Sequence, residues 1–178
     1  MGGMTAYHLS LKNPKLFDGV ILMAPALKNS INGFLIGMTS FLKTLLPKKS
    51  RLTKPFYGKA TKNPAITEFV KKDKYAFSER VCLSTISMMV DVMDKSPQTF
   101  KDYTSPFIIF QGGLDKLVNP EVCFELYEKS STPAEDKEIH FIEEMWHDIW
   151  HEEEIYEIME KSLKWMLNRI KKNQNSEE

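Results

Sequence analysis

Two residues with complementary chemistry follow two apolar stretches in the second half of the chain. Asp115 lies just past the apolar run 106–113, and His147 lies a few residues past a shorter run at 138–142. A carboxylate can hold an imidazole in one tautomer and stabilise its cation, so that the imidazole can act as a general base. The pair therefore indicates the acid and the base of a catalytic triad.

Each of these residues also has a simpler interpretation. Asp115 follows two glycines and could serve only as a turn residue. His147 and His151 stand at positions i and i+4 with Asp148 between them, which is the spacing of a zinc-binding helix. Metal-dependent peptidases normally use glutamate at the intervening position, and no persuasive third ligand follows, so the sequence disfavours a metal. Two further histidines are interpreted as structural, namely His8 and His140.

Apolar runs and helical periodicities alternate along much of the chain. The runs 19–25, 106–113 and 138–142 are typical of strands that are buried on both faces of a parallel sheet. Apolar spacing predicts helices over 1–11 and 155–170, and another that starts at Pro120 with Asn119 as its N-cap. Strands and helices in this order predict right-handed βα units and an α/β fold.

A long insertion separates the first two of these strands. Residues 27–103 contain short, lysine-rich helical stretches, including 34–46 and 84–93. Insertions of this length at one end of a sheet are typically lids or binding elements. We therefore assign 1–26 and 104–171 to the α/β core, 27–103 to a helical lid, and 172–178 to a disordered polar tail.

The composition is that of one globular domain, since 42% of the 178 residues are hydrophobic and the formal net charge is zero. This balance gives no reason to expect nucleic acid as a partner. Basic residues are concentrated in 43–74, where they could face an anionic membrane surface or simply be solvated. Two cysteines among apolar neighbours, and no secretory signal or membrane-spanning run, predict a cytoplasmic protein that is at most membrane-associated.

On these residues the chain resembles the C-terminal two thirds of the monoacylglycerol-lipase-like α/β-hydrolases, a serine hydrolase family that includes lysophospholipases. The nucleophile turn of that family reads Gly-x-Ser-Met-Gly-Gly, and Met1-Gly2-Gly3 would be its last three residues. The resemblance implies that the serine directly precedes Met1, whose backbone N–H would donate to the oxyanion. It also implies Asp115 as triad acid and His147 as general base, with Glu152 matching a glutamate that the family has after the histidine. The family usually has a glycine shortly before this histidine, where Glu144-Met145 stand here.

The same resemblance gives the remaining predictions. It implies a partial α/β-hydrolase fold with the last three strands of the family's sheet, and no cofactor or metal. The substrate would be a monoacylglycerol or lysophospholipid ester. The lid helix at 84–93 would line an acyl tunnel with Met88 and Met89, although core packing explains these methionines equally well.

A sheet with these three strands alone would have an open side next to strand 19–25. Open hydrophobic edges promote aggregation unless they are covered, so we expect the chain to be inactive and unstable alone. Three explanations remain open. The chain could be a fragment of a working lipase, a protein completed by a partner chain over the open sheet edge, or a degenerate hydrolase retained as an interaction or structural subunit.

Overall fold

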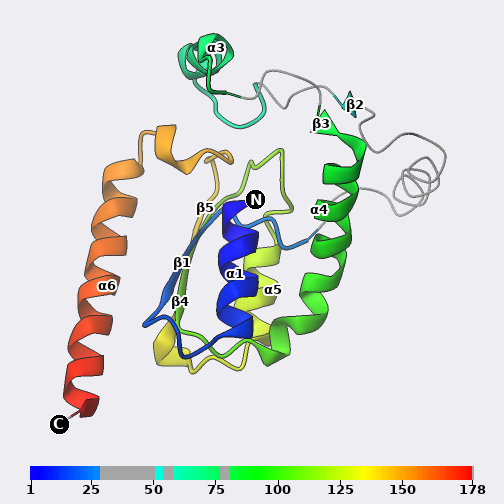
Figure 1. The fold of residues 1–178 in the computed structure, drawn as a ribbon. Helices are drawn as coiled ribbons and strands as arrows, with labels where there is room; N and C mark the ends of the chain where they lie inside the picture. Colours follow the sequence, from blue (N-terminus) through cyan, green and yellow to red (C-terminus); the bar gives the residue numbers. More distant parts are fainter. Residues whose placement is uncertain (29–50, 54–57, 77–80, 178) are drawn as a thin grey trace.

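The computed structural model describes residues 1–28, 51–53, 58–76 and 81–177 (Figure 1). Its centre is a three-stranded parallel sheet in the order β1 (Val20–Met23), β4 (Phe107–Gly112) and β5 (Lys137–Ile142). All three predicted strands are present, and each crossover is long enough for the parallel arrangement that the apolar runs indicate. The α/β prediction and the partial α/β-hydrolase sheet are therefore confirmed.

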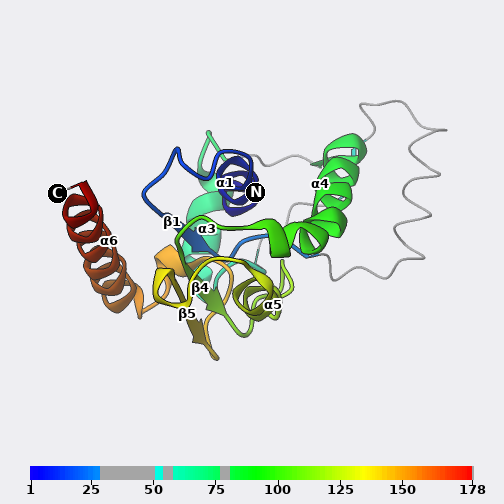
Figure 2. The same cartoon turned by 90° about the horizontal axis from the view of Figure 1, so that it is seen from below.

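Helices cover both faces of this sheet. Helices α1 (Gly2–Lys12) and α5 (Val122–Lys129) lie on one face, and α6 (Ile155–Glu177) lies on the other (Figure 2). Strand side chains alternate between the two, because successive residues of a strand point to opposite faces. Leu22 and Ile109 belong to the core on the α1 face, whereas Ile108 and Phe110 belong to the core on the α6 face.

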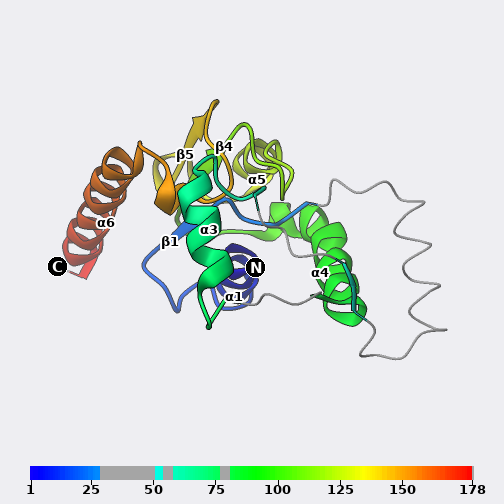
Figure 3. The same ribbon diagram turned by 90° about the horizontal axis from the view of Figure 1, so that it is seen from above.

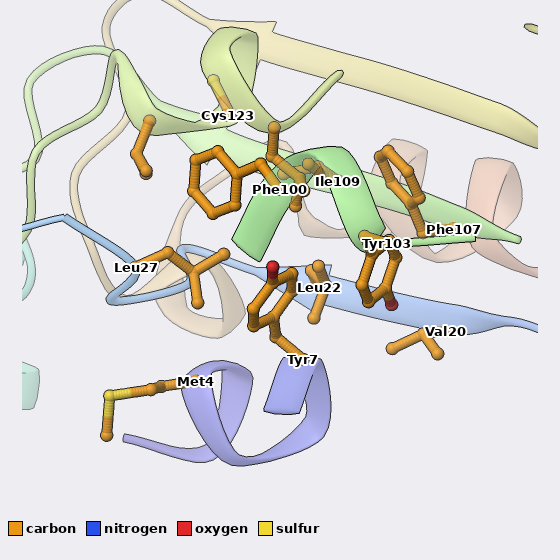
Figure 4. Packing of buried hydrophobic residues seen from close by; sticks show 12 residues of the cluster. Met4, Tyr7, Val20, Leu22, Leu27, Phe100, Tyr103, Phe107, Ile109 and Cys123 are labelled. Carbon is orange, nitrogen blue, oxygen red and sulfur yellow. The ribbon is translucent and has the colours of Figure 1, made fainter. Parts of the chain in front are cut away.

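The core on the α1 face is dense and rich in aromatic residues (Figure 4). Tyr7 of α1 stacks on Tyr103, with ring centroids 4.8 Å apart, and both rings are fully buried. Their hydroxyl groups are satisfied, since Tyr7 bonds to Thr99 at 2.8 Å and Tyr103 bonds to Ser10 at 2.7 Å. These contacts fix α1, and with it the N-terminal turn, against the sheet.

The insertion 27–103 contributes several short elements. These are the antiparallel pair β2 (Arg51–Thr53) and β3 (Val81–Cys82), helices α3 (Pro64–Lys72) and α4 (Leu83–Lys95), and the 3₁₀ turn η1 (Ser96–Asp102). Helix α4 corresponds to the helix predicted over 84–93, while the one predicted over 34–46 lies outside the described residues. Figures 1 and 3 place α3 over the carboxyl ends of the sheet strands.

Two predicted helix ends need correction. Helix α5 starts at Val122 rather than Pro120, because Asn119 caps a turn instead, its Oδ1 accepting the Glu121 N–H at 3.0 Å. Helix α6 continues through Glu177, over most of the stretch expected to be a disordered tail. Contacts with distant loops fix this part of α6, since Lys172 pairs with Asp136 at 2.5 Å and Asn173 donates to Asp18 at 2.6 Å.

Candidate active site

The structure brings Asp115 and His147 together. They follow the carboxyl ends of β4 and β5, which are neighbours in the sheet, and Nδ1 of His147 lies 2.7 Å from Oδ2 of Asp115. A carboxylate can only accept, so the neutral form of this imidazole has its proton on Nδ1 and its lone pair on Nε2. The Asp115 side chain is fully buried, whereas that of His147 is 25% exposed. The geometry therefore leaves Nε2 available to accept a proton.

The buried carboxylate is stabilised in its charged form. Its Oδ1 accepts the backbone N–H groups of Leu117 at 2.8 Å and Val118 at 3.0 Å. Burial acts to raise the pKa of Asp115, but the hydrogen bond and charge of His147 and these two N–H groups outweigh it, so the pKa is lowered. Asp115 is thus an anion at neutral pH and can stabilise an imidazolium.

Two glycines at the end of β4 allow the loop that carries Asp115 to touch the loop that carries His147. A Cβ atom on Gly112 would overlap the backbone carbonyl oxygens of Met145 and Trp146, and one on Gly113 would overlap that of Glu143. The close approach permits two backbone hydrogen bonds, from Gly113 N–H to Ile142 at 2.9 Å and from Leu114 N–H to Met145 at 3.0 Å. The loop that carries Asp115 and the loop that carries His147 are therefore in direct backbone contact.

Two further residues at this contact were not predicted from the sequence. Lys116, next to Asp115, places its Nζ 3.2 Å from the ring centroid of Trp146, next to His147. Gln111, the last polar residue of β4 before the glycines, is fully buried and its Nε2 donates to Asp115 Oδ2 at 3.2 Å. A glutamine inside the run Phe107–Gly112 was the available signal, because fully buried strands seldom carry an amide.

The N-terminal turn lies on the same side of the sheet ends as His147. Met1, Gly2 and Gly3 line a groove of about 940 Å³ together with His147. The groove runs between α1 and α6, and its floor includes Ile21 and Met23 of β1 together with Ala24. Gly3 allows α1 to approach closely, since a Cβ there would meet Pro25 at 3.0 Å. The predicted oxyanion residue and the predicted base thus share one groove.

The two predicted substrate-binding methionines are not brought to this groove. Met88 is 64% exposed on α4, and Met89 is partly buried against the core on the α1 face. The described lining of the groove takes its methionines from elsewhere, Met159 and Met166 of α6 among them.

The arrangement expected of a zinc helix does not form. Residues Ile149–His151 make a single 3₁₀ turn, and His151 bonds to Asp148 at 2.7 Å while His147 bonds to Asp115. In the part of the chain that the structure describes, no three His, Cys, Asp or Glu side chains converge on a possible metal position. The other two histidines have polar partners, His8 with Ser96 at 2.9 Å and His140 with Glu138 at 2.6 Å.

A parallel sheet with an acid and then a histidine after successive strands, facing a glycine-rich helix start, defines an α/β-hydrolase. The family model described as serine aminopeptidase, S33 matches residues 1–154. The chain therefore belongs to this hydrolase family.

Known proteins support the same fold. The monoacylglycerol lipase of Paleococcus ferrophilus superposes with a TM-score of 0.80 at 20% identity, covering 94% of this chain and 65% of that one. A soluble variant of Saccharomyces cerevisiae monoglyceride lipase gives a TM-score of 0.75 at 15% identity, covering 94% and 62%. An uncharacterized abhydrolase domain-containing protein of Dictyostelium discoideum is 23% identical over 177 residues.

This chain is shorter than the proteins it resembles. It spans 65% and 62% of the two lipases, and 19% of the Dictyostelium protein. Among the helices in the described ranges, none is both long and apolar enough to cross a membrane.

Proposed function

We propose that this chain supplies the acid and base of a serine esterase that hydrolyses monoacylglycerol or lysophospholipid esters. The observation that carries the proposal is the 2.7 Å hydrogen bond between His147 and the buried Asp115, at the rim of the groove that Met1 also lines. The substrate class is supported by the two lipase structures of similar fold, whose names specify monoacylglycerol or monoglyceride.

The roles follow from where the protons lie. Nε2 of His147 would take the proton of a serine hydroxyl as the serine oxygen bonds to the ester carbonyl carbon. The imidazolium, held by Asp115, would return this proton to the departing alcohol as the ester C–O bond breaks. Water would then release the fatty acid from the acyl-enzyme by the same route. The backbone N–H of Met1 would stabilise the oxyanion if a peptide bond precedes it.

The serine would come from polypeptide that covers the free side of β1. Within the described sheet, β1 pairs with β4, and its other edge borders the groove. Apolar side chains on α6 line this opening and are partly exposed, Met159 at 49% and Leu163 at 54%. Because about a third of each lipase has no counterpart in this chain, we infer that equivalent strands cover the groove. They would belong to the same polypeptide before Met1 or to a partner chain.

The first test compares the 178-residue chain with the natural protein isolated from its source. We expect the natural protein to hydrolyse monoacylglycerol and to react with a fluorophosphonate serine probe, and the 178-residue chain to do neither. Mass spectrometry of the natural N-terminus shows whether a serine directly precedes Met1. Labelling of the 178-residue chain would contradict the proposal, because one of its own serines, such as Ser10 or Ser84, would then be the nucleophile.

Matched histidine variants sharpen this test. In the natural protein, His147→Ala should reduce both labelling and hydrolysis to background, because the proposal assigns removal of the serine proton to Nε2 of His147. His151→Ala is the control, since His151 follows on the same loop but bonds to Asp148 and has a side chain that is 46% exposed. Equal loss in both variants would mean that the loop, rather than the imidazole of His147, is what matters.

The lid supports peripheral contact with a membrane as part of this function. Phe69 of α3 is 69% exposed and Tyr75 is 85% exposed, and they lie near Lys71, Lys72 and Lys74. Exposed aromatic residues beside lysines suit an anionic lipid surface. Phe69→Asp should therefore reduce co-sedimentation with phosphatidylserine vesicles, whereas Leu16→Asp, a change at a residue 65% exposed before β1, should not.

A second candidate function is a non-catalytic interaction subunit. The exposed apolar residues of the groove favour it, because they provide a binding surface whether or not a nucleophile is present. In that case the natural protein would resist the fluorophosphonate probe and would co-purify with another chain. A folded monomer without a partner would argue against this alternative.

A further inference from the structure

Gln111 is a fully buried amide directly behind the acid of the candidate triad. Its Nε2 donates to Asp115 Oδ2 at 3.2 Å and to the Gly112 carbonyl oxygen at 3.1 Å. Its Oε1 is also buried, and it has no hydrogen-bond partner in the described part of the chain. Gln111 therefore donates two hydrogen bonds through Nε2, while its buried Oε1 has no partner among the described residues.

The orientation of this amide is set by Asp115. Rotating the amide by half a turn would place Oε1 against two oxygen acceptors, one of them charged, and would lose both donations. An apolar side chain of similar length would fill the same space without leaving a buried oxygen unpaired, which costs free energy. Simple packing therefore does not explain why an amide stands here, whereas donation to a carboxylate does, since hydrogen bonds to charged groups are stronger.

We propose that Gln111 is a positioning residue that holds Oδ2 of Asp115 against the Nδ1–H of His147. A carboxylate accepts about four hydrogen bonds, and Asp115 has four donors: the backbone N–H groups of Leu117 and Val118 on Oδ1, and Gln111 and His147 on Oδ2. With both oxygens saturated, the carboxylate cannot rotate away from the imidazole. The inference rests on the triad roles proposed above for Asp115 and His147.

The same donor would matter when the imidazole becomes charged. Once Nε2 of His147 accepts a proton, the Nδ1 proton has two possible resting places, the imidazole and the Asp115 carboxylate. A donated N–H on Oδ2 favours the charged form of the carboxylate, so the proton stays on Nδ1. Gln111 would thus act on the base through Asp115 without touching the substrate.

The test is NMR spectroscopy of the natural protein with ¹⁵N in its histidine and glutamine side chains. In Gln111→Met, which keeps the length of the side chain, the Nδ1–H proton of His147 should exchange with water about tenfold faster than in the unmodified protein, the effect of losing one charge-assisted hydrogen bond. Ile109→Val is the control, because Ile109 is equally buried on β4 and packs in the core on the α1 face. An exchange rate within twofold of the unmodified protein in Gln111→Met, or the same acceleration in the control, would overturn the proposal.

A second measurement needs no variant. In the unmodified protein, the two Nε2 protons of Gln111 should be protected from exchange, because each has an acceptor and neither is exposed. Rapid exchange of these protons would also overturn the proposal. Neither measurement needs a substrate or a nucleophile. A protein that fails as an esterase can still show the Gln111 effect, and an active esterase can lack it.

Discussion

The two sides of the sheet end differ sharply in how completely they are built. At the ends of β4 and β5, backbone hydrogen bonds, two close-packed glycines and the hydrogen bond from His147 to the buried Asp115 side chain join the loops. At the end of β1, the groove is open, and Met166 of α6 is 40% exposed beside it. Asp115 and His147 are therefore positioned by contacts within this chain, whereas the side that the proposed nucleophile would occupy depends on polypeptide that would cover β1.

The largest expected effect tests whether the side of the sheet at β4 and β5, where the loops are joined, contributes most of the stability. Phe110 is fully buried on β4 and stacks on His140, so Phe110→Ala should lower the free energy of unfolding by about 3–5 kcal/mol. Met166→Ala should lower it by less than about 1 kcal/mol, because much of that side chain already faces water. Urea unfolding of the 178-residue chain measures both, in a buffer with a stabilising osmolyte because the chain is expected to be unstable alone.

The same pair of variants also tests the covering of the groove. In the natural protein, Met166→Ala should become clearly more destabilising than in the 178-residue chain, because covered apolar surface contributes to stability. An equally small effect in both proteins would mean that nothing packs on this part of α6.

The next effect compares two glycines, Gly112 at the end of β4 and Gly2 at the groove. Gly112→Ala should destabilise the protein by about 1–3 kcal/mol, because the added methyl group overlaps carbonyl oxygens of the base loop. Gly2→Ala should be neutral or slightly stabilising, since nothing lies within 4 Å of the new atom at the start of α1. Chemical denaturation gives the stabilities, and the His147 ring signals in ¹⁵N spectra should shift in Gly112→Ala alone. Unchanged ring signals in that variant would show that the loops can separate without moving His147.

A smaller effect comes from the lowered pKa of Asp115. The ionised carboxylate contributes stability above its ordinary pKa near 3.8, and this contribution is lost as the pH falls through the lower pKa of the folded state. The difference in free energy of unfolding between the unmodified protein and Asp115→Asn should therefore be largest above this range and shrink as the pH falls below it. Urea unfolding across a pH series measures it, with Glu135→Gln, an exposed carboxylate, as the control. A difference that grows on acidification would contradict the assignment.

The side of the sheet at β4 and β5 was also the easier one to predict from sequence. Strand β4 is buried along its whole length, as its continuous apolar run predicts, and the shorter runs at β1 and β5 also marked strands. Burial of β5 on both faces was wrong, because β5 ends the described sheet and none of its residues is fully buried. The carboxyl ends of neighbouring parallel strands share an edge of the sheet. That rule is enough to expect Asp115 near His147. The roles of these residues and of Met1 in catalysis remain predictions.

Other features depend on contacts that local sequence does not reveal. Strands β2 and β3 have only three and two residues, too few to show a hydrophobic period, and helix α3 has nine residues and buries none of them. The end of α6 is helical because loops more than 30 residues away provide Asp18 and Asp136 as partners. From sequence alone Gln111 is one more residue of the strand, because its hydrogen bond to Asp115 depends on how the following loop folds back onto β4.

The smallest expected effect concerns the contact of Lys116 with Trp146. This cation–π pair joins the residue after the acid to the residue before the base, and Lys116 is exposed, so we expect about 0.5–1 kcal/mol from it. Lys116→Met keeps the aliphatic stem and removes the charge, so it should lower the free energy of unfolding by about that amount and should broaden the ring signals of His147. Lys129→Met is the matched control, since Lys129 pairs with Glu125 on α5, away from the site. If both variants behave alike, the backbone hydrogen bonds and glycines hold the loops together without help from Lys116.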